Sequence, residues 1–114
     1  MVNTSEIHSE FTSIEGVTLL KRESFQDNRG SFFRLLCTET LSDSFPGLTF
    51  VQSNVSYNPT PGTVRGLHGQ KQPYSETKLV TCIDGSIYDV VVDMREHSPT
   101  FLRHEAFSLS LIHI

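Results

Sequence analysis

The sequence has few cysteines, no long hydrophobic run and no excess of basic residues, and each shortage excludes a class of protein. Cys37 and Cys82 form no CxxC pair, which fits the reduced thiols of a cytoplasmic protein better than a disulfide framework. No apolar run approaches the roughly 20 residues of a membrane-spanning helix. The polar, acidic start MVNTSEIHSE lacks the features of a secretory signal. We therefore expect no membrane association.

The charge balance argues against nucleic acid as a partner. Nine Lys and Arg residues stand against 13 Asp and Glu, giving a formal net charge of −4. A mildly acidic chain has no electrostatic footprint for nucleic acid. A length of 114 residues with 37% hydrophobic and 19% charged residues is typical of one globular domain.

Short β-segments separated by turn residues make up most of the chain. The turn signals are DNRG (27–30), the Pro- and Gly-containing stretch 58–62 and Asp84-Gly85. A short helix is predicted to begin at Ser42, and residues 1–15 are predicted to form a loose arm or an edge strand. The predicted strand segments are GVTLLKRESF, SFFRLLC, LTFVQSNVSY, TVRGLHGQ, KLVTCI and SIYDVVVDM. This pattern predicts an all-β antiparallel sandwich or barrel.

Asp84-Gly85 is a strong signal for a two-residue hairpin, and it fixes a testable register. Val80 would pair with Asp89 and Lys78 with Val91, so that Lys78 has Asp89 and Asp93 as diagonal neighbours. The lysine is then either part of a solvated outer face or held in a barrel mouth by carboxylates. The other face would be the core, with Leu79, Ile83, Tyr88, Val90, Val92 and Met94.

His68 is a candidate chemical group because it lies between two glycines in VRGLHGQ. Glycine in a strand marks a bulge or the close approach of a ligand. The histidine is a general base, a metal ligand or an ordinary structural residue. The position where a second metal-binding histidine is expected holds Gln70, and Glu76 is an unsupported third ligand, so no required metal is expected.

Other polar residues suit a nucleotide ligand or a solvated surface. Arg29 and Arg65 each adjoin a glycine, and a guanidinium group suits bidentate phosphate recognition, although most arginines are simply exposed. Gln52 and Asn54 alternate onto one face of their predicted strand. That face is either solvated or lines a polar pocket.

The blocks DNRGSFFR, FVQSNVS, VRGLHGQ, TKLVTCIDGSIYDVVVDMR and SPTF together resemble the dTDP-4-dehydrorhamnose 3,5-epimerase family over about residues 16–107. The resemblance implies a cupin-type antiparallel jelly roll (a double-stranded β-helix), a dTDP-sugar substrate, no cofactor and a homodimer. It identifies His68 with the base that removes a proton beside the 4-keto group, and Lys78 with the cation that stabilises the enolate. The hairpin register adds Asp89 as the group that orients the lysine. The residues it assigns to substrate binding are Arg29, Phe32, Gln52, Asn54, Arg65 and Gln70.

Three positions depart from a simple fit to the family. Strict alternation puts Arg65 and His68 on opposite faces, so we predict a bulge or twist at residues 66–69. Arg34 stands where the family usually has glutamate, and Gly69 where it usually has an aromatic residue. These differences leave open a related sugar nucleotide, converted by a single-centre epimerase or a 3,4-ketoisomerase. A non-catalytic nucleotide-sugar-binding cupin is the alternative outside the enzymes.

The end of the sequence departs from the family more strongly. We expect residues 16–108 to be a partial epimerase domain, incomplete at its C-terminus and without the family's proton-donating tyrosine. The last six residues, LSLIHI (109–114), back-translate to CTG TCT CTT ATA CAC ATC, the end of a transposase adapter, and are interpreted as a non-native tail. An incomplete jelly roll leaves strand edges unpaired, so we expect impaired activity and poor stability or aggregation of the isolated chain.

Overall fold

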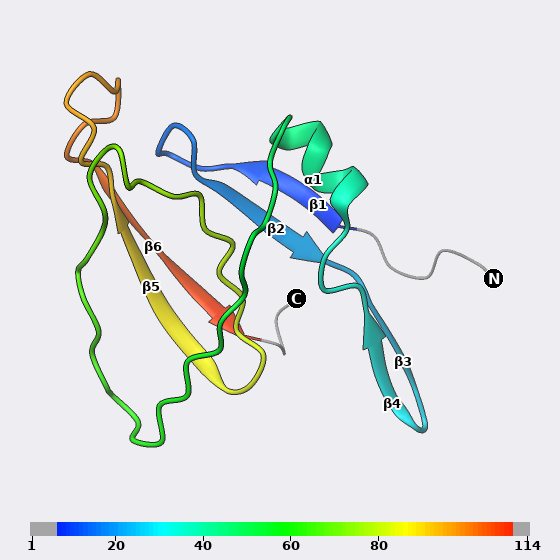
Figure 1. Ribbon diagram of the computed structural model, residues 1–114. Helices are drawn as coiled ribbons and strands as arrows, with labels where there is room; N and C mark the ends of the chain where they lie inside the picture. The colour runs from blue at the N-terminus through cyan, green and yellow to red at the C-terminus, as the bar shows by residue number, and fades with distance from the viewer. Residues whose placement is uncertain (1–6, 111–114) are drawn as a thin grey trace. The chain divides into compact units, whose positions relative to one another are not determined.

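The computed structural model describes residues 7–110 as short antiparallel strands with one short helix (Figure 1). The elements in chain order are β1 (Ile7–Phe11), β2 (Thr18–Arg22), β3 (Ser24–Asp27), β4 (Gly30–Phe33), α1 (Thr38–Ser44), β5 (Ser86–Val92) and β6 (His104–Ser110). Within the described range they form three two-stranded sheets, β1-β2, β3-β4 and β5-β6. None of the described helices is long and apolar enough to cross a membrane.

The chain divides into two units, and each is described by itself. The first contains residues 7–48 and 81–110 and holds every described strand and the helix. The second, residues 49–80, contains neither strand nor helix and is the long green segment of Figure 1. The strands predicted over LTFVQSNVSY and TVRGLHGQ are therefore wrong for this structure. A strand needs a partner for its backbone N–H and C=O groups, and the described part of the chain provides none here.

The β1-β2 hairpin includes part of the segment that was predicted to form a loose arm or an edge strand. Ile7 pairs with Arg22 and Phe11 with Thr18, so residues 7–11 adopt the edge-strand alternative, while 1–6 lie outside the described residues. Thr12 Oγ1 donates to the carbonyl of Val17 at 2.7 Å, which closes the connecting turn. The turn also buries Ile14, whose exposed fraction is 2%.

The β3-β4 hairpin forms at the predicted DNRG turn. Asp27 pairs with Gly30, and the turn residues are Asn28 and Arg29. The Asp27 carboxylate accepts the backbone N–H of Arg29 at 2.8 Å, the local bond that makes aspartate a good turn residue. The strand after the turn ends at Phe33, so only the start of the predicted SFFRLLC strand is regular.

The helix is real but starts at Thr38 rather than at the predicted Ser42. Cys37 is the N-cap, with extended backbone angles, and Leu41 is the buried residue of the helix at 4% exposure. The first helical turn carries Glu39, whose carboxylate suits the positive end of a helix. The prediction missed this start because cysteine is not a usual capping residue.

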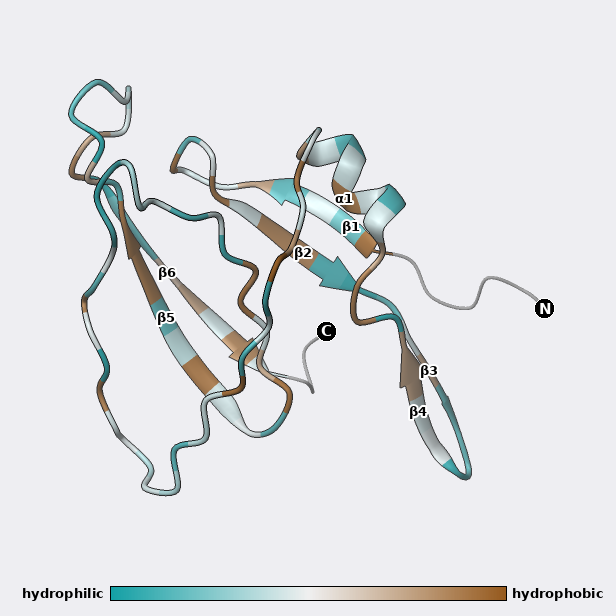
Figure 2. Cartoon of the chain, viewed as in Figure 1, coloured by the Kyte–Doolittle hydropathy of each residue, from teal (hydrophilic) through white to brown (hydrophobic). Residues whose placement is uncertain are grey.

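The β5 strand is confirmed, but its predicted partner is wrong. It pairs over its whole length with β6, from Ser86 opposite Ser110 to Val92 opposite His104, and residues 78–83 form no strand. Along β5 the polar pair Tyr88 and Asp89 is followed by three consecutive valines, the brown end of the strand in Figure 2. The predicted core face fails at Ile83, Tyr88 and Met94, which are 51%, 73% and 68% exposed.

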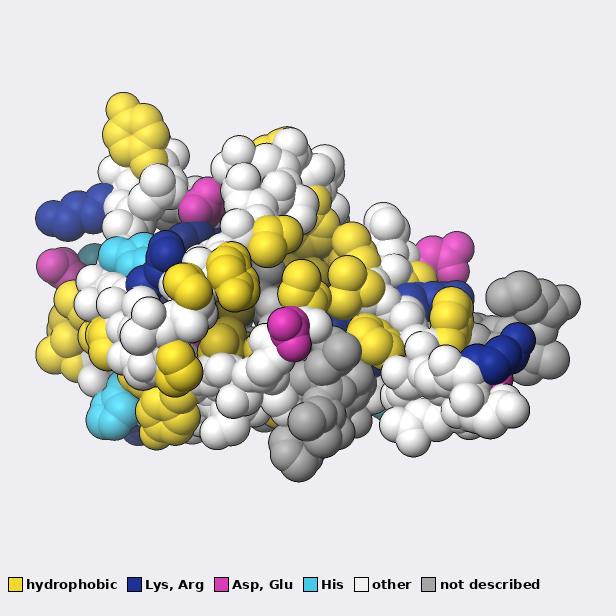
Figure 3. Space-filling view, turned by 90° about the horizontal axis from the view of Figure 1, so that it is seen from below, with side chains coloured by type: hydrophobic (Ala, Val, Ile, Leu, Met, Phe, Trp, Pro, Cys, Tyr) yellow, Lys and Arg dark blue, Asp and Glu magenta, His cyan; other side chains and the backbone are white. Residues whose placement is uncertain are grey.

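The described core is small. Its buried hydrophobic residues are Ile14, Leu41 and Cys82, and two polar residues, Asp93 and Thr100, are buried with them. Many hydrophobic side chains lie at the surface, as the yellow atoms of Figure 3 show. The fold of the first unit therefore depends on backbone pairing and on a buried polar network as well as on apolar packing.

Candidate functional site

The predicted catalytic histidine, His68, lies in the second unit, two residues after Gly66. Gly66 has φ of +96°, in the region that favours glycine. A Cβ placed on Gly66 would lie 2.9 Å from His68 Nδ1, so the imidazole packs directly over this glycine. Gly66 has a positive φ, but no described strand includes residues 66–69, so the bulge or twist predicted within a strand is not formed there. The side chain of His68 is exposed and accessible to a ligand.

Arg65 is held by a neighbour that the sequence analysis did not identify. Its Nε donates to Oδ1 of Asn58 at 2.7 Å, across the turn at residues 60–62. Its terminal guanidinium nitrogens have no hydrogen-bond partner among the described residues, so they are available to an anion. The Nε–H group of the guanidinium is thereby fixed, while the terminal N–H groups stay open to a phosphate.

Lys78 forms an ion pair with Glu76, whose carboxylate lies 3.2 Å from Nζ. Both side chains are about half exposed, so the pair is weak and easily exchanged for a ligand. The register that placed Lys78 opposite Val91, and Asp89 beside it, is wrong, because residues 78–83 form no described strand and the described partner of β5 is β6.

Arg29 lies at the tip of the β3-β4 hairpin and is 85% exposed. Its Nε and Nη2 donate to Oδ2 of Asp27 at 3.1 and 2.6 Å, a two-point contact. This guanidinium holds the pKa of the Asp27 carboxyl below its ordinary value. Phe32, 58% exposed, pairs across the hairpin with Phe25.

The remaining predicted binding residues are exposed polar side chains of the second unit. Gln52, Asn54 and Gln70 lie outside any strand, so the shared strand face predicted for Gln52 and Asn54 is not formed. Among residues 7–110 no three His, Cys, Asp or Glu side chains are grouped closely enough to hold a metal ion.

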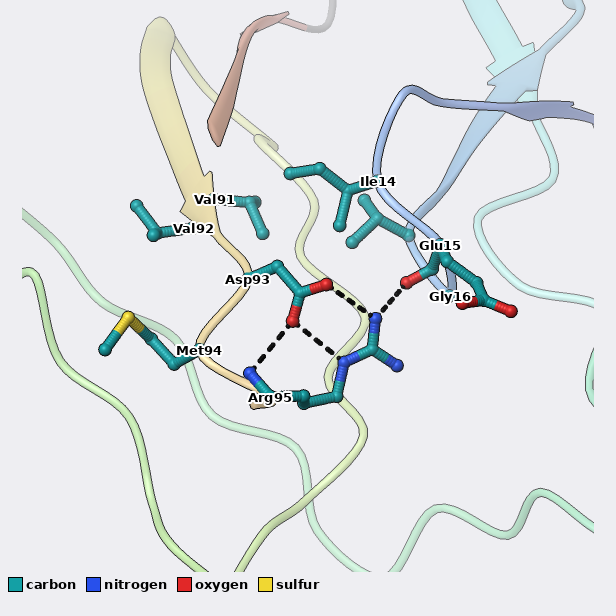
Figure 4. Close-up of a pocket in the computed structure, with 9 residues that line it drawn as sticks. Ile14, Glu15, Gly16, Val91, Val92, Asp93, Met94 and Arg95 are labelled. Carbon is teal, nitrogen blue, oxygen red and sulfur yellow. Dashed lines mark hydrogen bonds and ion pairs between the residues drawn. The ribbon is translucent and has the colours of Figure 1, made fainter. Parts of the chain in front are cut away.

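A densely hydrogen-bonded polar cluster around Asp93 in the first unit was missed by the sequence analysis. Asp93 Oδ1 accepts the backbone N–H and Nε–H of Arg95 at 3.0 and 2.9 Å, and Oδ2 accepts Nη2–H at 3.0 Å (Figure 4). Ser98 Oγ and Thr100 Oγ1 also donate to Oδ2, the latter at 2.6 Å. Arg95 also donates through Nη2 to the carbonyl oxygen of Glu15. The cluster therefore ties the β1-β2 turn to the loop after β5.

This cluster has a clear electrostatic consequence. The Arg95 guanidinium, followed by the hydroxyls of Ser98 and Thr100, holds the pKa of the Asp93 carboxyl far below its ordinary value. In return, Asp93 raises the pKa of Arg95. A cavity of about 270 Å³ adjoins the cluster and is lined partly by Ile14, Val91 and Val92. The sequence signal was the spacing of Arg, Ser and Thr at two, five and seven positions after the aspartate.

Comparison with known proteins decides the family. A sequence model of dTDP-4-dehydrorhamnose 3,5-epimerase matches residues 11–112. The chain belongs to the dTDP-4-dehydrorhamnose 3,5-epimerase family. The match begins before the predicted limit at residue 16 and includes residues 109–112 of the segment interpreted as a tail.

Individual members of this epimerase family support the assignment. The epimerase of Sinorhizobium fredii is 36% identical over 105 residues, which are 92% of this chain and 54% of the relative. That of Shigella flexneri is 38% identical over 100 residues, 87% of this chain and 55% of the relative. The chain thus spans about half the length of the curated relatives that it matches.

A solved epimerase also supports the fold. The crystal structure of the Bacillus anthracis epimerase, with TDP and PPi bound, matches with a TM-score of 0.88 and 39% identity, covering 95% of this chain and 62% of that one. The predicted all-β, cupin-type class is therefore confirmed.

Proposed function

We propose that this chain carries the proton-abstracting half of a dTDP-4-dehydrorhamnose 3,5-epimerase. The substrate would be dTDP-4-dehydro-6-deoxyglucose and the product dTDP-4-dehydrorhamnose, in the biosynthesis of dTDP-rhamnose or a related deoxysugar. The observation that carries the proposal is the family match over residues 11–112, which includes His68, Arg65 and Lys78. The exposed His68 imidazole supports it, because a general base must reach the substrate.

The proposed chemistry needs two side chains of the second unit. His68 takes the proton from a carbon beside the 4-keto group; the electrons of the C–H bond form a C=C bond, and the keto π electrons move to oxygen. Lys78 leaves its weak pair with Glu76 and places its ammonium at the resulting enolate oxygen. The enolate oxygen re-forms the C=O bond as the carbon takes a proton from solvent, and delivery of that proton to the opposite face inverts the centre. The ketone already acidifies both neighbouring C–H bonds, so the step uses no cofactor.

Binding of the substrate would use the diphosphate and the sugar separately. Arg65 presents free guanidinium N–H groups, and Arg29 can exchange Asp27 for a phosphate. The bound TDP and PPi of the Bacillus anthracis relative support a nucleotide diphosphate as the ligand. Phe32 and the polar residues Gln52, Asn54 and Gln70 are proposed to complete the binding set. Asp89 was expected to orient Lys78 through the predicted hairpin register, and that register is not formed.

The proposed cellular location and oligomeric state follow from the same resemblance. The protein would act in the cytoplasm, where sugar nucleotides are made, and as a homodimer. Sedimentation of the purified chain with and without dTDP tests the second statement.

Solvent exchange tests the function directly. The 114-residue chain is incubated with dTDP-4-dehydro-6-deoxyglucose in D₂O, and the proton signals at C3 and C5 are followed by NMR. Both signals should disappear, and His68→Ala should slow their loss by about 10²- to 10⁴-fold, the usual contribution of a general base. His97→Ala is the matched control, because His97 is exposed and belongs to the other unit.

Each other outcome of this experiment identifies an alternative. Exchange at one carbon alone indicates a single-centre epimerase, and migration of the keto group indicates a 3,4-ketoisomerase. Tight binding of dTDP without any exchange indicates a non-catalytic binding protein. Full exchange by His68→Ala would refute the assignment of the base.

A further inference from the structure

Gly66 and His68 make the closest glycine contact of the second unit. A Cβ on Gly66 would lie 2.9 Å from His68 Nδ1, 3.2 Å from its backbone nitrogen and 3.6 Å from Cε1. The first distance is shorter than any ordinary van der Waals contact, so a methyl group and the imidazole cannot share this space. The imidazole occupies the volume that a side chain at position 66 would fill.

The other glycines of this unit show that the contact is particular to Gly66. Gly62 has a similar backbone angle, with φ of +81°, yet a Cβ there would meet nothing within 4 Å. Gly69, next to the histidine, also faces open space. Gly62 is therefore needed for its backbone conformation alone, whereas Gly66 is needed for its conformation and for the room it leaves.

The contact determines how the imidazole is presented. Nδ1 is the ring atom nearest to the position that a Cβ of Gly66 would take, and Nε2 is not among the three atoms nearest to that position, so Nδ1 and not Nε2 faces position 66. No group within residues 7–110 hydrogen-bonds to the imidazole. Within the described residues, the close approach to Gly66 is therefore the contact that restrains this ring.

We propose that Gly66 is a positioning residue for His68, which by lacking a side chain seats the imidazole with Nε2 presented to the substrate. The inference rests on the proposed role of His68 as the base. A base must lie within hydrogen-bond distance of the proton it removes. A displacement of about 1 Å can reduce the rate on the order of 100-fold. A methyl group at position 66 would force a displacement of this kind, because the ring is the movable partner.

The first test examines ring placement without using activity. In the wild-type chain, a nuclear Overhauser effect is expected between the Gly66 Hα protons and the His68 Hε1 proton. Gly66→Ala should shift the His68 Cε1–Hε1 resonance, and Gly62→Ala should leave it in place. Absence of the wild-type effect would overturn the proposal, and so would an unchanged His68 resonance in Gly66→Ala.

The second test examines the consequence for the reaction. Gly66→Ala should lower the substrate exchange rate in D₂O by about 100-fold at saturation, with dTDP affinity within twofold of wild type. Gly62→Ala introduces the same kind of backbone strain without the contact, and should stay within threefold for both quantities. Equal losses in the two variants would assign the effect to backbone strain and overturn the proposal. If the wild-type chain shows no exchange, the proposed function fails, and the resonance measurements still decide whether Gly66 seats the ring.

Discussion

Removing one hydroxyl from the Asp93 cluster gives the sharpest test of what stabilises the first unit. Thr100 is 8% exposed, and its Oγ1 donates to Asp93 Oδ2 at 2.6 Å while accepting the backbone N–H of Glu15 at 3.3 Å. Thr100→Val keeps the shape of the side chain and removes these two bonds together with the 3.2 Å hydrogen bond between the hydroxyls of Thr100 and Ser98. The effect of the variant is therefore due to hydrogen bonding and not to a cavity.

The magnitude follows from the kinds of bond that are lost. A hydrogen bond to a charged group contributes about 1.5–3 kcal/mol, and the short bond to Asp93 belongs to this class. The bond from Glu15 is long and lies near solvent, so it adds little. Asp93 keeps Arg95 and Ser98, which prevents the larger penalty of an unpaired carboxylate. We expect Thr100→Val to lower the free energy of unfolding by about 2 kcal/mol and the Tm by about 8 °C.

Urea unfolding followed by circular dichroism measures this loss, with Thr38→Val as the control. Thr38 is exposed, and its side chain makes no hydrogen bond within the described residues. Its substitution should change the free energy of unfolding by less than about 0.5 kcal/mol. Equal stabilities for Thr100→Val and wild type would show that the cluster does not hold the unit together, and would refute the reasoning.

Three further predictions concern pH, binding and the core. The pKa of Asp93 is depressed in the folded state, so its contribution to the free energy of unfolding is complete above the unfolded pKa of about 4. That contribution is lost as the pH falls below this value, which measurement of the Tm at a series of acidic pH values checks. Asn58→Ala frees the guanidinium of Arg65 and should weaken dTDP binding about fivefold, measured by calorimetry, without changing the exchange rate at saturation. Leu41→Ala should cost about 2–5 kcal/mol in urea unfolding, whereas Leu35→Ala, at a position 48% exposed, should cost much less.

Sequence reasoning succeeded where the structure is determined by local chemistry. The DNRG hairpin forms because Asp27 bonds to the backbone of Arg29 two residues later, a preference that the sequence displays directly. Strand β5 was found for a similar reason, since its run of β-branched residues needs no knowledge of the partner. In both cases the decisive atoms lie within a few residues of one another.

It failed where the structure depends on which distant segments meet. The strand β6 was missed, and with it the true partner of β5, because HEAFSLS shows no stronger pattern than KLVTCI. The residues proposed for catalysis could be named from motifs, but their placement could not. A bulge or twist at residues 66–69 was predicted within a strand that is not formed, and the contact between Gly66 and His68 required coordinates.

Asp93 bonds to residues of its own loop and not to Lys78 across the predicted hairpin, and the reason is physical. The hairpin register offered it Lys78, a flexible side chain at a diagonal position, whose capture would have cost side-chain entropy for one weak ion pair. Arg95, Ser98 and Thr100 lie two to seven residues further along the same loop, so closing the contacts costs little chain entropy. Together they give the carboxylate more hydrogen bonds than a single ammonium group on Lys78 would have made. Among the described residues, Lys78 instead forms its ion pair with Glu76, and both side chains are about half exposed.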